Sequence, residues 1–246
     1  MTADRWTQAV RQQLNLGRLL PLGGPSDGAW ITEEAAGAVL RRAASAVPGV
    51  RPGALRLTLG DPDAAPAPSV PAPPSALPPG PLRVTADFAA TAAEPLPTTA
   101  DRLRTALSAA AEQRLGLTVA EVDLRVTALV DALVDEETES EAVPPPPQPQ
   151  QARPPVDGEA GAAAAAALAV PGVSCLTGVL GGTGRAVHID DGPGDAASAR
   201  RHVRVELAVD ADHRALEVAR KVRTRVGIAL PDHPTVAVLV TAVVLG

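Results

Sequence analysis

The tetrapeptide Val47-Pro48-Gly49-Val50 occurs twice in the chain, and its second copy is Val170-Pro171-Gly172-Val173. Each copy follows an alanine-rich segment and precedes a stretch in which apolar residues recur. A Pro-Gly pair ends a helix, and apolar residues at every second position are typical of a half-buried strand. The motif therefore marks a passage from helix to strand, and the chain makes this passage twice.

The residues around the first copy predict a small α+β module. Thr32 is a candidate N-cap, because the acids Glu33 and Glu34 follow it and suit the positive end of a helix dipole. That helix would end at Pro48-Gly49. We expect the remaining elements in this order: a strand with Leu55, Leu57 and Leu59, a strand with Leu82, Val84, Ala86 and Phe88, a helix from Thr98 or Thr99 to Gly116, and a strand from Val122 to Val130.

The second half of the chain repeats this order of elements. Leu82-Arg83-Val84 corresponds to Val203-Arg204-Val205, and Val126-Thr127-Ala128 corresponds to Val240-Thr241-Ala242. The offset between partners changes only in predicted loops, where a change of length costs little. We therefore predict an α+β protein of two tandem copies of a helix-strands-helix-strand module, each a sheet with helices packed on it.

Composition divides the chain into four parts. Residues 1–30 are expected to form an N-terminal helix and a lead-in, 31–130 the first module, 131–159 an acidic, proline-rich linker, and 160–246 the second module. The stretch 60–81 is rich in alanine and proline, and proline has no backbone N–H to donate to a sheet. We expect it to be a loop between two strands of the first module.

Charge and cysteine content limit the classes of function. The net charge is −6, whereas a protein that coats nucleic acid needs a basic surface. Cys175 is the single cysteine, so no internal disulfide can form and a reducing compartment is indicated. No apolar run approaches the roughly 20 residues of a membrane-spanning helix. We expect a cytoplasmic protein with no transmembrane segment.

On these motifs the chain resembles the alkaline shock protein family, small general-stress and envelope-stress proteins of Gram-positive bacteria. The resemblance is closer over 31–130 than over 160–246. Family members usually have one module, and they usually carry an aromatic-glycine pair in the loop that corresponds to Thr91–Thr98, which this chain lacks. The resemblance implies a non-catalytic role at the cell envelope, through a membrane-anchored partner. The residues that carry it are Ala44–Val50, Leu82–Phe88, Leu103–Leu117 and Val119–Val130.

The glycine-rich stretch Val179–Arg185 is a candidate phosphate-binding loop. A P-loop needs a lysine and a hydroxyl at fixed spacing after its glycines, and this stretch has neither the spacing nor the lysine. We expect a hairpin turn instead, between the strands Leu176–Leu180 and Arg185–Ile189.

Two further groups of residues are candidate chemical sites. Cys175, His188 and Asp190 could form a nucleophile, base and orienting acid, but a small thiol in a predicted strand is more often buried. A metal site of His188, Asp190, Asp191 and His202 lacks the spacing of a helix or a tight loop. We therefore expect no enzyme activity, no cofactor and no metal.

The predicted helix 212–226 carries most of the basic residues of the second module. Asp212 can cap it, and Glu217 and Lys221 form a favourable i,i+4 pair. Its basic face is either a solvated helix surface or a contact for something anionic, such as the acidic linker, an acidic partner, a lipid surface or nucleic acid. No aromatic residue accompanies it, so base stacking is not expected. The candidate partner-binding residues are Arg214, Arg220, Lys221, Arg223 and Arg225.

The last predicted strand, Val236–Leu245, is apolar on both faces. Such a strand needs cover on both sides. The first module, a second copy of the chain or the N-terminal helix could supply it. Taken together, we expect a non-enzymatic scaffold or adaptor in envelope or general stress physiology that binds a protein partner, with a nucleic-acid or regulatory binding module as the alternative.

Overall fold

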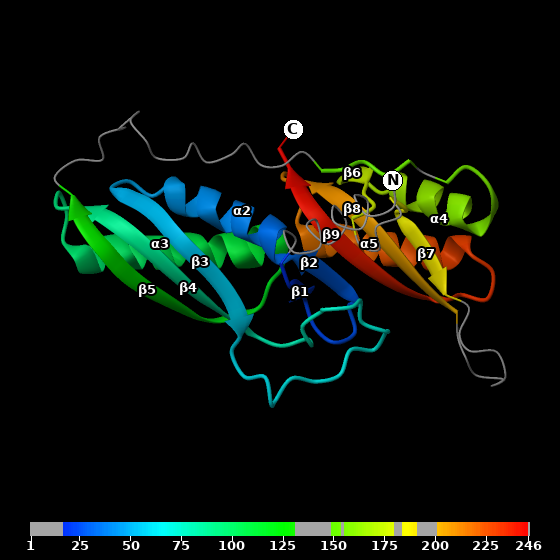
Figure 1. Ribbon diagram of the computed structural model, residues 1–246, viewed down its shortest axis with the longest axis horizontal. Helices are drawn as coiled ribbons and strands as arrows, with labels where there is room; N and C mark the ends of the chain where they lie inside the picture. The colour runs from blue at the N-terminus through cyan, green and yellow to red at the C-terminus, as the bar shows by residue number, and fades with distance from the viewer. Residues whose placement is uncertain (1–16, 131–148, 154, 180–183, 191–200, 246) are drawn as a thin grey trace, which may run out of the picture.

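The computed structural model describes residues 17–130, 149–153, 155–179, 184–190 and 201–245. The predicted N-terminal helix and most of the predicted linker lie outside these ranges. The α+β class is confirmed, since helices pack on two sheets that lie side by side (Figure 1). Among the described helices, none has the length and the apolar character needed to cross a membrane.

The first module is built on a three-stranded sheet of order β3-β4-β5. β3 and β4 are antiparallel, whereas β4 and β5 are parallel and are connected by the helical segments. The predicted loop 60–81 connects β3 and β4. The elements are α2 (Glu33–Ser45), β3 (Val50–Leu59), β4 (Leu82–Thr91), α3 (Leu96–Ala109), its π-helical continuation η1 (Ala110–Leu115) and β5 (Val119–Val130).

The second module repeats this topology with one interruption. β8 is parallel to β9 and antiparallel to both β6 and β7. The predicted hairpin is therefore wrong: β6 and β7 lie one after the other along the same side of β8, in the place that β3 has beside β4. The elements are α4 (Gly158–Leu168), β6 (Val173–Leu176), β7 (Val187–Asp190), β8 (His202–Asp210), α5 (Ala215–Ala229) and β9 (Thr235–Val244).

The repeated Val-Pro-Gly-Val motif makes the same turn in both modules. Gly49 and Gly172 have φ values of 76° and 93°, which glycine adopts without a steric penalty. The Gly49 carbonyl accepts a hydrogen bond from the Thr91 N–H at 3.0 Å, and the Gly172 carbonyl accepts one from Asp210 at 2.9 Å. The motif therefore ties the helix-to-strand turn to the far end of the next strand.

A β-bulge is also repeated. The β4–β5 register skips Thr127, and the β8–β9 register skips Thr241. Each hydroxyl donates a hydrogen bond across the bulge, from Thr127 to the Phe88 carbonyl at 3.2 Å and from Thr241 to the Leu207 carbonyl at 3.3 Å. The two modules thus match at the level of single hydrogen bonds.

The sheet of the second module is extended by the start of the first. The strands β1 (Leu19–Leu22) and β2 (Ala29–Thr32) form a hairpin, and β2 pairs in parallel with β9. Thr32 then caps α2 as predicted, since its hydroxyl accepts a hydrogen bond from Ala35 N–H at 3.2 Å. The same hydroxyl lies 3.2 Å from the Thr241 carbonyl in β9 and donates to it. Sequence analysis treated this hairpin only as a lead-in.

The two modules share one core. A single cluster of buried side chains includes Leu57 and Phe88 of the first module and Val205 and Val238 of the second. α2 makes this possible, because it contacts both β3 and β9.

The loop 60–81 of the first module covers the other face of the second sheet. Val70 from this loop packs with Leu19, Trp30 and Leu239 in a separate buried cluster. Trp30 Nε1 donates to the Leu77 carbonyl at 3.3 Å, and the Leu77 N–H donates to the Leu19 carbonyl at 2.8 Å. The last strand, β9, was predicted to need cover on both faces. The 60–81 loop of the first module covers one of these faces.

Two predicted helix caps are wrong. α3 begins at Leu96, so Thr98 and Thr99 lie inside its first turns, and its N-cap position is Pro95. α5 begins at Ala215 after Arg214, so Asp212 lies before the helix. Neither helix has a side-chain cap. The prediction that Gly116 ends the helical segment is confirmed, and its φ of 87° is the reason that glycine stands there.

Candidate functional site

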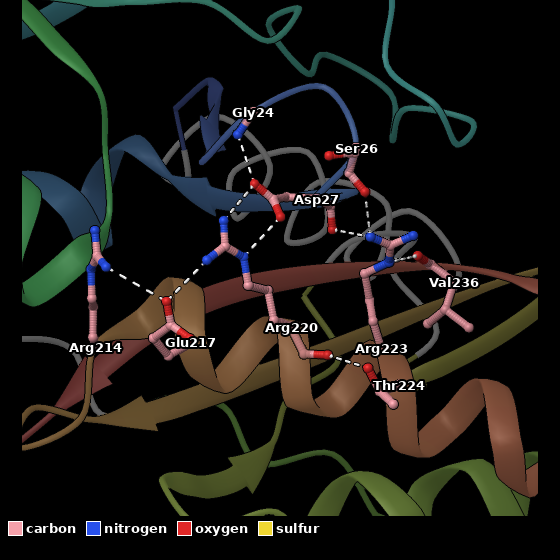
Figure 2. A network of polar contacts seen from close by, with 9 residues as sticks. All are labelled: Gly24, Ser26, Asp27, Arg214, Glu217, Arg220, Arg223, Thr224 and Val236. Atoms are coloured by element: carbon pink, nitrogen blue, oxygen red, sulfur yellow. Dashed lines mark hydrogen bonds and ion pairs between the residues drawn. The ribbon is translucent and has the colours of Figure 1, made fainter.

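The basic face of α5 was the predicted partner-binding surface, and Arg220 lies at its centre. Its guanidinium donates to both carboxylate oxygens of Asp27, with Nε–Oδ1 at 2.8 Å and Nη2–Oδ2 at 3.1 Å (Figure 2). It also donates to Glu217 Oε1 at 3.0 Å. Two parallel N–H···O bonds to one carboxylate are the strong form of this interaction. Arg220 therefore joins α5 to the β1–β2 turn.

Asp27 is held in its charged form. Partial burial pushes the pKa of Asp27 upward, but hydrogen bonds from Arg220 and the Gly24 N–H, together with the charges of Arg220 and Arg223, outweigh it, and the pKa lies below its ordinary value. The Gly24 N–H donates at 2.7 Å. The carboxylate thus organises its own turn as well as the contact to α5.

Arg223 binds backbone carbonyls rather than acids. Its Nη1 donates to the carbonyls of Ser26 and Asp27, each at 2.6 Å, and its Nε donates to the Val236 carbonyl at 2.9 Å (Figure 2). Burial lowers the pKa of Arg223 from its ordinary value, and the Asp27 charge opposes this effect. Arg223 thus fixes the turn before β2 to the start of β9.

The remaining basic residues of α5 divide into two groups. Arg214 donates to the Glu112 carbonyl of η1 at 2.9 Å and lies 3.5 Å from Glu217. Glu217 pairs with Arg214 and Arg220, so the predicted pair with Lys221 is wrong: both arginines lie on its side of the helix at i,i±3. Lys221 and Arg225 are exposed and line a surface hollow of about 400 Å³ beside Val170 and Pro171.

In this arrangement the basic face of α5 mainly makes contacts within the chain. Arg214, Arg220 and Arg223 hold η1, the β1–β2 turn and β9 together. Two of the five predicted residues remain as an outward cationic surface.

The other candidate groups are spread over the second sheet. Cys175 is half-buried in β6, and burial together with the Asp210 charge raises the pKa of its thiol, which disfavours the nucleophilic thiolate. His188 Nε2 lies 3.1 Å from the Arg185 carbonyl, and His202 Nδ1 lies 2.9 Å from the Thr235 hydroxyl.

No metal-binding constellation is formed by the part of the chain that the structure describes. There, no group of three or more His, Cys, Asp or Glu residues could hold an ion. Asp191, a member of the candidate set, lies outside the described residues.

A buried acid in β8 was not among the residues predicted from the sequence. Glu206 in β8 has no exposed surface, and its carboxylate accepts a hydrogen bond from the Val179 N–H at 2.8 Å. His188 and Arg204 lie 3.5 and 3.7 Å from it. The signal was an acid in the middle of a strand, with the apolar residues Val205 and Leu207 on either side of it. Its contacts connect β8 to the segment after β6 and to β7.

The sequence also did not predict that one edge of β5 has no partner strand among the described residues. In the second module β9 lies between β8 and β2, whereas in the first module β5 is the last strand of its sheet (Figure 1). Counting from the shared bulge, Leu124–Val126 of β5 corresponds to Val238–Val240 of β9, the residues that pair with β2. Within the described residues, the first module therefore leaves open the edge that the second module fills.

Apolar side chains are exposed along this edge. Val126 is 39% exposed, while its counterpart Val240 is fully buried. Leu129 is 58% exposed. In the second module α2 and β2 lie beside β9, and no described element has this place beside β5. The exposed side chains follow from the missing neighbour.

Charged side chains occupy the opposite face of β5. Arg83 of β4 pairs with Glu121 at 2.7 Å and lies 3.7 Å from Asp123. Arg125 makes two hydrogen bonds to Asp87, at 2.9 and 2.7 Å, and remains 73% exposed. These cross-strand pairs hold β5 to β4 and leave charge available at the edge.

No protein-family model matches this chain, and no curated protein shows a significant match to it. The resemblance to the alkaline shock proteins therefore stays a prediction.

Proposed function

We propose that this chain is a non-catalytic scaffold or adaptor that acts through protein–protein contacts, with the open edge of β5 as its contact site. The observation that carries the proposal is the difference between the modules: the same strand edge has a partner strand in the second module, and no described strand pairs with it in the first. An exposed strand edge presents unpaired N–H and C=O groups to another strand.

The pairing of β2 with β9 supports this proposal by example. It shows that this strand position accepts a parallel neighbour and buries the side chains beside it. Val126 and Leu129 of β5 offer apolar area that a partner would remove from water. Protein contacts at strand edges combine these same two contributions.

The alternative, a nucleic-acid or regulatory module using α5, has less support. Arg214, Arg220 and Arg223 already bind groups of the chain itself, so binding an anion there would compete with internal contacts. The net charge of −6 also opposes phosphate binding. From the resemblance we add to the proposal a role in envelope or general stress physiology, a cytoplasmic location and a membrane-anchored partner.

Site-specific photo-crosslinking tests the proposal. A photoreactive amino acid at Leu129 should give adducts with a polypeptide in cells, whereas the same group at Leu168 of α4, also an exposed leucine (42%), should give none. Adducts at neither position, or equally at both, would contradict a role for the β5 edge. Tight, salt-sensitive retention of DNA or RNA by the purified chain would favour the nucleic-acid alternative instead.

A further inference from the structure

We propose that the strand that pairs with the β5 edge is β5 of a second copy of this chain, antiparallel to it, around a twofold axis at Leu124. This inference rests on the proposed function, because it uses the same edge. The partner is thus a second copy of the chain. The first modules of the two copies would form one continuous sheet of order β3-β4-β5-β5-β4-β3.

The charges of β5 select this register. With Leu124 opposite Leu124, Asp123 of each copy stands directly opposite Arg125 of the other. Opposite charges at directly paired positions stabilise an antiparallel strand pair, and like charges destabilise it. Asp123 is 45% exposed and Arg125 is 73% exposed, so both can reach a partner at the edge.

Neighbouring registers of the same orientation are worse. A centre at Asp123 places the two Asp123 carboxylates opposite each other. A centre at Arg125 does the same with the two guanidinium groups. A centre between residues would set charged positions of one copy opposite apolar positions of the other, because side chains alternate between faces. A centre at Asp123 would also set Glu121 opposite Arg125, but only the centre at Leu124 gives two opposite-charge pairs without a like-charge pair.

The apolar face agrees with the same register. Three apolar residues of β5 point to the face that carries the core, and their partners in β4 are also apolar. The pairs are Val122 with Val84, Leu124 with Ala86, and Val126 with Phe88. In the proposed pair, Val122 of one copy stands opposite Val126 of the other. The half-exposed Val126 would thereby gain an apolar neighbour, which its counterpart Val240 already has within the chain.

The bulge limits the length of the contact. Regular pairing can run from Glu121 to Thr127, between the two irregularities of the β4–β5 register. Within this stretch the Val122 carbonyl accepts a hydrogen bond from Arg104 Nε at 3.5 Å, which a partner strand would have to replace. The arrangement uses the same surface on both copies and therefore closes on itself, so it predicts a dimer rather than a fibre.

Charge reversal gives a test that a general loss of folding cannot imitate. Sedimentation velocity on the full chain should show a dimer with a Kd no weaker than about 100 µM. Asp123→Arg alone and Arg125→Asp alone each place like charges opposite at both contacts, and each should raise the Kd by about tenfold or more. An equimolar mixture of the two variants restores both pairs and should form a heterodimer. The double variant should form a homodimer.

A wild-type chain that stays monomeric at about 100 µM, or a mixture that fails to associate although both variants keep their thermal unfolding transition, would overturn the inference. If residues 131–148 of the same chain occupied the edge instead, the wild type would be monomeric and their deletion would produce the dimer. Adducts between Leu129 and a different polypeptide, with a monomeric chain, would retain the proposed function and overturn only this partner.

Discussion

Single residues join the β1–β2 hairpin to the second module, and Asp27 is the clearest case. Its carboxylate binds Arg220 of α5 and the Gly24 N–H of its own turn, and only 13% of its side chain is exposed. Arg220 is 45% exposed, so solvent screens the pair and its contribution is modest. The Asp27–Arg220 contact therefore fixes the β1–β2 turn to α5 locally, while buried apolar side chains provide most of the packing around it.

Replacing Asp27 with Asn should lower the free energy of unfolding at pH 7 by about 1 kcal/mol, because the charge and one bidentate contact are lost. The folded pKa of Asp27 lies below its ordinary value, so its stabilisation is present above roughly pH 4 and is lost as the pH falls through the folded pKa. The difference between wild type and D27N should therefore shrink on acidification, as measured by urea unfolding at several pH values. Asp101→Asn, at an exposed i,i+3 pair, is the control and should change stability by less than about 0.5 kcal/mol. Equal losses in both variants would contradict this account.

At the scale of elements, the shared bulge shows how one device serves two environments. Thr241 is 8% exposed, and its hydroxyl also lies 2.7 Å from the Thr177 hydroxyl. Thr127 makes the equivalent bond to the Phe88 carbonyl of the central strand β4, but the Thr127 side chain itself is exposed to water. The same hydrogen bond should therefore contribute differently to stability in the two modules.

Thr241→Val should destabilise the protein by about 1–3 kcal/mol, because the buried Leu207 carbonyl and the Thr177 hydroxyl lose a partner. Thr127→Val makes the same chemical change at an exposed position and should cost less than about 0.5 kcal/mol. Chemical denaturation of both variants measures the difference. Similar losses at the two sites would show that the edge of β5 is buried in solution, which would itself support occupancy of that edge.

Sequence analysis predicted the elements better than their partners. The turn at Pro48-Gly49 and the Thr32 cap were predictable, because local chemistry determines each of them. The pairing of β2 with β9 was not, since four residues give no usable periodicity and the partner lies about two hundred positions away. The role of Arg223 could not be predicted either, because its acceptors are backbone carbonyls, and every residue type has one.

At the scale of the whole molecule, the modules are repeated in sequence but pack together through one buried cluster. β2 belongs to the second sheet, and the 60–81 loop covers the far face of that sheet. The Gly23 N–H donates to the Gly116 carbonyl at 3.1 Å, which joins the lead-in to the end of η1. Because each module completes the other, neither can lose its core without exposing apolar surface of its neighbour.

Thermal unfolding should therefore occur in one cooperative transition, with calorimetric and van't Hoff enthalpies in agreement. Leu57→Ala in the first module and Val205→Ala in the second each remove buried side-chain volume from the shared core, and losses of about 1–5 kcal/mol are expected for such truncations. Each variant should lower the single Tm of the whole chain. Differential scanning calorimetry distinguishes this from independent modules, for which each substitution would shift one of two transitions and leave the other in place. The exposed substitution Leu168→Ala in α4 controls for loss of leucine outside the core. A split transition in either core variant would show that the common cluster does not couple the modules, and the contacts of α2 with both sheets would then contribute little to stability.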